Sequence, residues 1–160
     1  MSELGTTGKF LDPRGVDHPR HYNMHPSGVE VIEIKRYLIS NIADAFKYVL
    51  RQGEKGDQRK DLEKALWYLR DQLAGGPRPP RTLYVLNAQE FMQRVILAET
   101  RLDMLAFLNG VDHYSKFGAT QDLYNAVMAV ESMLAQLDEP WGDRNGPGSG
   151  PPNSGAVLPE

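Results

Sequence analysis

A set of polar side chains suited to phosphate binding recurs at helical spacing in the first half of the chain. At i, i+3, i+4 and i+7 stand Asp44, Lys47, Tyr48 and Arg51, which a helix would place side by side. Lys55 follows in a glycine-containing turn. Arginine offers a planar fork to phosphate oxygens and lysine a compact charge, so this stretch is suited to a di- or triphosphate. The alternative is a solvated face of salt bridges.

The next segment adds a cation and a large aromatic side chain. Lys64 and Trp67 fall on the side of residues 62–73 away from its leucines. A tryptophan on a charged face needs something to cover it. A stacked nucleobase would do so, and a neighbouring subunit would do so equally well.

Three of the four histidines lie in a short segment ahead of the predicted helices. They are His18, His21 and His25, and a transition-metal site there is the less favoured interpretation, because their spacing within a loop is weak evidence and no carboxylate or thiolate completes a ligand set. We favour a loop that folds over the site, with His21 as a hydrogen-bond donor or acid and Tyr22 as a stacking ring.

Paired carboxylates give a rival interpretation. Glu30 and Glu33 stand one helical turn apart, as do Asp57 and Asp61, so the two pairs could bind Mg²⁺ between helices. Such acids are similar to those of the all-α nucleoside triphosphate pyrophosphohydrolases. Equally, Asp57 and Asp61 would suit the positive N-terminal end of a helix.

Apolar spacing predicts an all-α fold that positions these groups. Apolar residues recur at helical spacing in five stretches, although the first is rich enough in Val and Ile to allow a strand. The predicted helices cover about 29–39, 42–50, 62–73, 91–105 and 123–137.

The fourth predicted helix carries more apolar surface than one stripe requires. Its additional apolar residues are Met92, Ile96, Leu97, Met104 and Leu108. A helix that is apolar on most sides must be covered on several sides. This pattern predicts a homo-oligomer.

Glycine and proline divide the chain into five parts. We expect a flexible N-terminus at 1–15, a first helical domain at 16–74, a Gly/Pro linker at 75–82, and a second helical region at 83–137 that serves oligomerisation. Residues 138–160 contain five Pro and five Gly, which predicts a disordered tail.

Composition sets limits on function. The 160 residues carry a formal charge of −3 and no cysteine, which excludes disulfides and thiolate chemistry and argues against nucleic acid as a partner. Without a long apolar run, we expect a cytoplasmic protein with no membrane partner. The chain also lacks GxxxxGK[ST], so a P-loop is not expected.

Four blocks, in order, resemble the SaV-like phage nucleotide kinase family over about residues 16–73. They are DHPRHY at 17–22, GVEVIE at 28–33, AFKYVLR at 45–51 with Gly53 and KGD at 55–57, and DLEKALWYL at 61–69. The resemblance implies a large oligomeric deoxynucleoside monophosphate kinase without a P-loop, acting on thymidine and guanosine nucleotides in the host cytoplasm. A nucleoside triphosphate would be the phosphoryl donor.

The resemblance also implies that no metal cofactor is required, although Mg²⁺ can accompany the nucleotide. Side chains must then meet the charge of phosphoryl transfer, and the candidates are Lys47, Arg51, Lys55 and Lys64. Tyr22, Tyr48 and Trp67 would hold the substrate, with His21 or Asp61 assisting proton transfer or orientation.

One departure from the family pattern concerns Asp44, where members usually carry Asn. A carboxylate beside the phosphate clamp should weaken anion binding or change the substrate. A non-catalytic accessory protein that binds a nucleotide or a host protein is therefore a third class of function.

Overall fold

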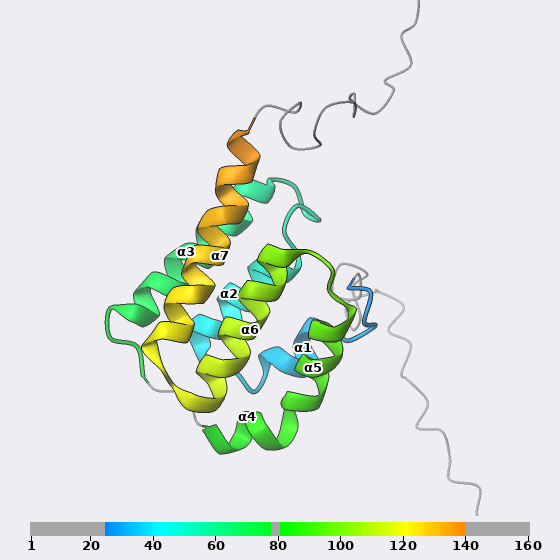
Figure 1. The fold of residues 1–160 in the computed structure, drawn as a ribbon, viewed down its shortest axis with the longest axis vertical. Helices are drawn as coiled ribbons and strands as arrows, with labels where there is room; N and C mark the ends of the chain where they lie inside the picture. Colours follow the sequence, from blue (N-terminus) through cyan, green and yellow to red (C-terminus); the bar gives the residue numbers. More distant parts are fainter. Residues whose placement is uncertain (1–24, 78–80, 140–160) are drawn as a thin grey trace, which may run out of the picture.

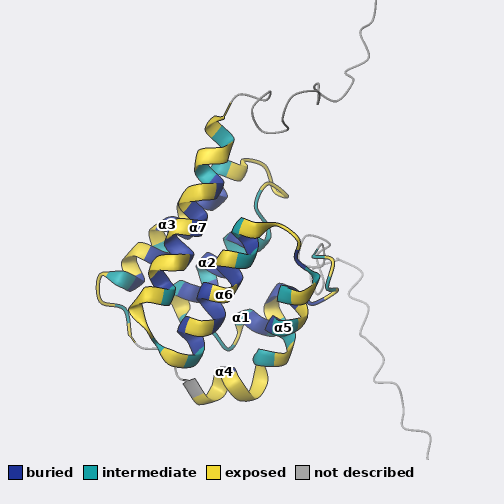
Figure 2. Cartoon of the chain, viewed as in Figure 1, coloured by how far each residue is buried: buried dark blue, intermediate teal, exposed yellow. Residues whose placement is uncertain are grey.

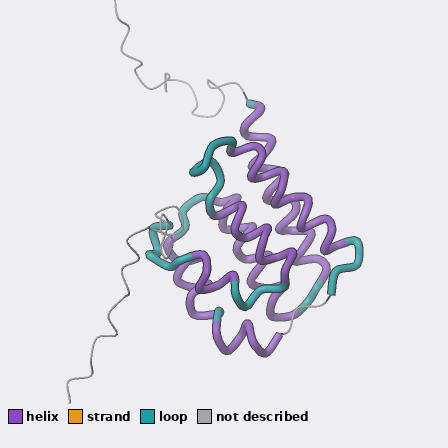
Figure 3. Tube along the Cα trace, turned by 180° about the vertical axis from the view of Figure 1, so that it is seen from behind, coloured by secondary structure: helices purple, strands orange, loops and turns teal. Residues whose placement is uncertain are grey.

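The computed structural model describes residues 25–77 and 81–139. Every regular element in these ranges is a helix, which confirms the all-α prediction. Figures 1 and 3 show the arrangement from opposite sides. The predictions for residues 1–15 and for 140–160 lie outside the described residues. The helices are α1 (Val31–Lys35), α2 (Ser40–Leu50), α3 (Gln58–Leu73), α4 (Arg81–Asn87), α5 (Gln89–Ala98), α6 (Leu102–Phe117) and α7 (Thr120–Asp138).

The first helix is shorter than predicted. α1 begins at a capping box, in which the Glu33 carboxylate accepts the Glu30 N–H at 2.8 Å. It ends at Lys35 because the chain tightens into turn hydrogen bonds, such as Tyr37 N–H to Ile34 O at 3.0 Å. The prediction of one helix over 29–39 is therefore wrong in its extent.

The predicted fourth helix is two helices. Between α5 and α6, Glu99 and Arg101 adopt extended backbone, with ψ of 138° and 126°. The Glu99 carboxylate accepts the N–H groups of Thr100 and Arg101, both at 2.8 Å, and pairs with the Arg101 guanidinium. These bonds satisfy the backbone donors of the two residues that precede α6, so the extended break is stabilised.

The break also changes the argument for self-association. Met92, Met104 and Leu108 are buried within one chain, and Ile96 packs against the core. Leu97 remains 84% exposed. Most of the apolar surplus that predicted a homo-oligomer is thus covered without a partner, and self-association stays a prediction.

α3 connects the two sides of the molecule. It packs against α2 on one side and α7 on the other, and α7 packs against α6. Arg70 of α3 pairs with Glu131 of α7 at 2.7 Å, and Arg59 pairs with Asp138. One buried cluster runs from Val29 to Met133, and Figure 2 shows the buried faces turned inward. Helices from before and after the 75–82 segment therefore share a core.

The segment predicted as a linker is held to the helices by a buried amide. The Gln72 Nε2 donates to the Pro77 carbonyl at 2.8 Å and to the Tyr114 hydroxyl at 2.9 Å. A Cβ at Gly76 would lie 2.1 Å from the Gln72 Oε1, so a larger residue would displace this amide from its hydrogen bonds. The following helix, α4, begins at Arg81, inside the expected linker.

α6 and α7 approach each other closely at another glycine. A Cβ at Gly110 would lie 2.8 Å from the Asp122 carbonyl oxygen and 3.1 Å from the Ala126 Cβ. The absence of a side chain lets the two backbones approach here. None of the helices in the two described ranges, including the long α7, is both long and apolar enough to cross a membrane.

Candidate functional site

The polar side of α2 carries cations around a tyrosine ring. The opposite side of the helix is buried, which fixes this face outward. The Lys47 Nζ lies 4.5 Å from the centroid of the Tyr48 ring, and the Arg51 Cζ lies 4.7 Å from it. Both distances are within cation–π range.

α3 completes this arrangement from the other side. The Lys64 Nζ lies 5.3 Å from the Tyr48 ring centroid, and the Tyr68 ring stacks on Tyr48 at 6.0 Å with an interplanar angle of 11°. We call Lys47, Tyr48, Arg51, Lys64 and Tyr68 the Tyr48 cluster. Of the residues proposed from sequence, the structure thus brings Lys47, Tyr48, Arg51 and Lys64 together.

Asp44 bridges two lysines beside the cluster. Its Oδ1 lies 3.0 Å from the Lys47 Nζ and 3.5 Å from the Lys35 Nζ. Burial raises the pKa of Asp44, but the Lys47 hydrogen bond and the charges of both lysines outweigh that effect and leave the pKa below its usual value. The carboxylate therefore occupies a position that favours an anion.

Asp61 holds Arg51 and the turn after α2. Its Oδ1 accepts a hydrogen bond from the Arg51 Nη2 at 3.0 Å, and its Oδ2 accepts the Gly53 N–H at 3.4 Å. The side chain is 8% exposed, so the pair is shielded from water. The Arg51 Nε is buried and has no hydrogen-bond partner among the residues that the structure describes. In this geometry Asp61 is placed to orient Arg51.

The turn between α2 and α3 carries Lys55 in an exposed position. Partial burial raises the pKa of the neighbouring Glu54, the Arg51 charge offsets part of this rise, and the Asp61 charge adds to it. The charges of Arg51 and Asp61 therefore also act on the Glu54 carboxyl.

Positive charge exceeds negative charge around the cluster. Four cations (Lys35, Lys47, Arg51, Lys64) accompany three carboxylates (Asp44, Asp61 and the adjacent Glu54), an excess of one. Lys64 pairs with no carboxylate in the described part of the chain. Lys35 was missed by sequence reasoning, because it comes from α1 and has no regular spacing to the α2 residues.

Trp67 borders the cluster and is open to solvent. Its ring meets Tyr68 edge-on at 5.0 Å, and 61% of the residue is exposed. A shallow hollow of about 450 Å³ lies beside it, lined by residues of α3 that include Arg70 and Asp71. An exposed aromatic face therefore adjoins the cations.

The acidic residues proposed for Mg²⁺ each have another contact. Glu30 and Glu33 form the capping box of α1, and the Asp57 side chain caps α3 by accepting the Lys60 N–H. Asp61 pairs with Arg51. Within residues 25–77 and 81–139, no three His, Asp or Glu side chains are grouped to hold a metal ion.

Two proposed site residues, His21 and Tyr22, lie outside the described residues, as does His18. His25 is described, and its ring is buried, with the Nε2 atom 3.4 Å from the Glu99 Oε2. Ser27 N–H donates to the His25 Nδ1 at 3.2 Å. This histidine therefore joins the segment before α1 to the break between α5 and α6.

Comparison with known proteins bears on the segment that contains the cluster. No curated protein and no solved structure matches the chain. A family model matches part of the chain, and because that match ends within α3, helices α4–α7 lie outside it. Residues 16–70 are similar to a family whose model is described as a protein of unknown function (DUF3310).

Proposed function

We propose that the protein binds nucleotides at the Tyr48 cluster and acts as a deoxynucleoside monophosphate kinase. The observation that carries the proposal is the convergence of Lys47, Arg51 and Lys64, from two helices, on one tyrosine ring. Lys47 and Arg51 each have one carboxylate partner, whereas Lys64 pairs with none among the described residues, so a phosphate chain would balance the remaining positive charge. Such a site suits a polyanionic ligand of nucleotide size.

The neighbouring aromatics suit the base of the same ligand. Trp67 contacts Tyr68, which stacks on Tyr48, so the open face of Trp67 adjoins the cations. A nucleobase on Trp67 would cover an exposed ring and direct its phosphates toward Lys64. Tyr22 is the second base contact that the family resemblance suggests.

The resemblance extends the proposal from binding to phosphoryl transfer. An oxygen of the monophosphate attacks the γ-phosphorus of the triphosphate, and the bond from that phosphorus to the bridging oxygen breaks. The products are two diphosphates. Negative charge on the transferring group would be met by Lys47, Arg51 and Lys64, with Lys55 reaching in from the turn.

The supporting residues have distinct tasks in this proposal. Asp61 orients the Arg51 guanidinium, through the 3.0 Å hydrogen bond. His21 would supply or accept a proton. No metal cofactor is required of the protein, and Mg²⁺ would arrive with the triphosphate.

The test uses a matched pair of lysine variants. Purified protein is incubated with dTMP or dGMP and a nucleoside triphosphate, with and without EDTA, and the products are separated by chromatography. Lys64→Ala should reduce diphosphate formation by about tenfold or more, equivalent to about 1.4 kcal/mol. Lys60→Ala, an exposed lysine one turn away on α3 that lies near Asp57, should change the rate little.

Other outcomes would select another function. Equal effects of Lys64→Ala and Lys60→Ala on the rate would show that the Tyr48 cluster is not the nucleotide site. Pyrophosphate release from a triphosphate alone, dependent on Mg²⁺, would point to a pyrophosphohydrolase. Tight nucleotide binding by calorimetry without any product would indicate a non-catalytic nucleotide-binding protein.

A further inference from the structure

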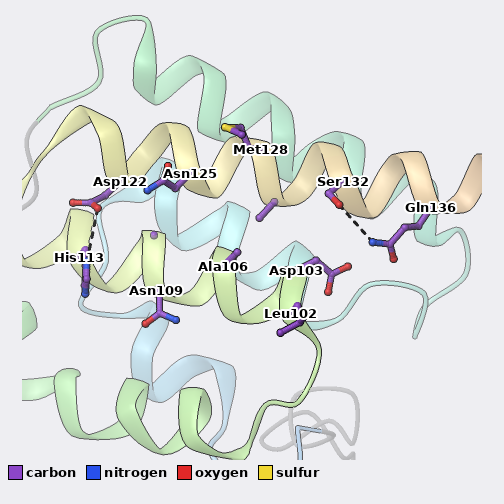
Figure 4. Close-up of a pocket in the computed structure, with 12 residues that line it drawn as sticks. Leu102, Asp103, Ala106, Asn109, His113, Asp122, Asn125, Met128, Ser132 and Gln136 are labelled. Atoms are coloured by element: carbon purple, nitrogen blue, oxygen red, sulfur yellow. Dashed lines mark hydrogen bonds and ion pairs between the residues drawn. The ribbon is translucent and has the colours of Figure 1, made fainter.

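A groove between α6 and α7 lies outside the proposed nucleotide site. Its volume is about 630 Å³, and it runs along both helices (Figure 4). From Asp103 to His113, the groove follows α6 for about 15 Å, at roughly 1.5 Å per residue. That length matches about three turns of a helix.

The groove has small residues on its floor and large apolar residues at its edges. Ala106, Gly110 and Ala129 line it, and at Gly110 the α7 backbone lies too close for a side chain. Leu102 is 84% exposed and Met128 is 63% exposed. An unbranched methionine adapts to different partner side chains. This combination is typical of grooves that accept the apolar face of a helix.

Both ends of the groove are acidic. Asp103 lies at one end, near Gln136, and Asp122 lies at the other, beside His113 (Figure 4). The Asp122 Oδ1 is 3.8 Å from the His113 Nδ1. The described residues that line the groove include no Lys or Arg. With histidine counted as neutral, the lining therefore carries two negative charges, one at each end.

We propose that this groove binds an amphipathic helix of another protein, with an aliphatic stripe at its centre and a basic residue at each end. The stripe would lie between Leu102 and Met128, and the basic ends would meet Asp103 and Asp122. The charges argue against a second copy of this face. Since both ends are acidic, symmetric pairing in either orientation would bring carboxylates together.

The test uses two synthetic peptides of about 14 residues, roughly four helical turns. Both carry leucines at i, i+3, i+4 and i+7, and one has Arg in its first and last turns where the other has Glu. Calorimetry with the full chain at neutral pH should show binding of the Arg peptide and about tenfold weaker binding of the Glu peptide. Asp103→Asn/Asp122→Asn should remove most of this difference.

Steric variants locate the binding. Ala106 is exposed and lines the groove, so Ala106→Trp should fill the groove and abolish binding of the Arg peptide. Arg94 is an exposed residue of α5 outside the groove, so Arg94→Trp should leave binding unchanged. Circular dichroism checks that both variants keep their helices. Three results would overturn the proposal: equal binding of the two peptides, binding that survives Ala106→Trp, or no binding of either peptide. Light scattering that shows a dimer dissociated by Ala106→Trp would also overturn it, in favour of a second copy.

Discussion

Two charged clusters in this molecule differ in how their positive and negative charges are balanced. The carboxylate of Asp112 is 1% exposed and accepts hydrogen bonds from the Tyr84 hydroxyl at 2.7 Å, the Gln93 amide at 3.3 Å and the Lys116 ammonium at 2.7 Å. Its one negative charge is matched by one positive charge. The Tyr48 cluster is only partly buried and keeps an excess of cations.

The difference separates a structural cluster from a candidate binding site. Asp112 joins α4, α5 and α6, and its own charge is balanced by Lys116. Burial, the Asp112 charge and its hydrogen bond all raise the pKa of Tyr84, so the phenol keeps its proton and goes on donating. A buried group that is fully paired fixes helices, whereas surplus cations at the surface can attract an anion.

The largest expected effect comes from breaking the balanced cluster. Asp112→Ala leaves Lys116 without its partner and should lower the free energy of unfolding by about 3 kcal/mol. Urea denaturation followed by circular dichroism measures it. Glu63→Ala, an exposed acid on α3, serves as the control and should be nearly neutral. If Asp112→Ala does not fold, Tyr84→Phe should still cost about 1 kcal/mol.

A second paired carboxylate, that of Glu99, should stabilise the fold less at acid pH. Burial raises the pKa of Glu99. The hydrogen bonds from the Arg101 side chain and from the Arg101 and Thr100 N–H groups lower it by more than burial raises it, so the pKa falls to about 2. A depressed pKa in the folded state stabilises the protein at pH values above the unfolded pKa of about 4.5, and this contribution disappears as the pH falls toward 2.

Glu99→Gln tests that pH dependence. At neutral pH, the variant should be less stable than the wild type by about 2 kcal/mol. The difference should shrink when the pH is lowered from 5 to 3, as measured by urea denaturation at about unit pH steps. A difference that stays constant with pH would mean that the Glu99 charge does not stabilise the fold.

Replacement of Arg51 should lower both the stability of the fold and the activity. Arg51→Ala removes a proposed phosphate ligand and also leaves the 8% exposed Asp61 unpaired, so it should lower stability by about 1.5 kcal/mol as well as activity. Adding Asp61→Asn should restore part of the stability but none of the activity. Recovery of activity in the double variant would contradict the phosphate-binding role of Arg51.

The smallest effect should come from Asp44. Asp44→Asn removes a carboxylate that bridges Lys35 and Lys47, so the affinity for a nucleoside triphosphate should rise about threefold to tenfold, by roughly 1 kcal/mol. Calorimetry at low and high salt measures it, and the gain should diminish with salt. Glu90→Gln, an exposed acid on α5, is the control; an equal gain there would indicate a general charge effect.

Much of the fold could be predicted because its signals are local. The 3.6-residue period placed α2, α3 and α7 correctly, since each buries one stripe. The face with Lys47, Tyr48 and Arg51 followed from spacing within a single helix. Lys64 was proposed as a ligand, although its position against Tyr48 depends on how α2 and α3 pack.

The failures concern contacts that spacing does not encode. The break after Ala98 depends on a Glu99 side chain that accepts the N–H groups of Thr100 and Arg101, just before the next helix, and apolar periodicity continues across it. Lys35 reaches Asp44 from another helix. The start of α4 at Arg81 falls among residues that proline and glycine marked as a linker.

The contact between α3 and α7 bears on how the chain could be divided. Residues 16–70 match a family, yet within this molecule α7 covers one side of α3 and lies outside the match. A polypeptide that ended after α3 would expose that side to water. Two fragments made by opening the chain near residues 78–80 should therefore be poorly folded when expressed apart and should reassemble when expressed together.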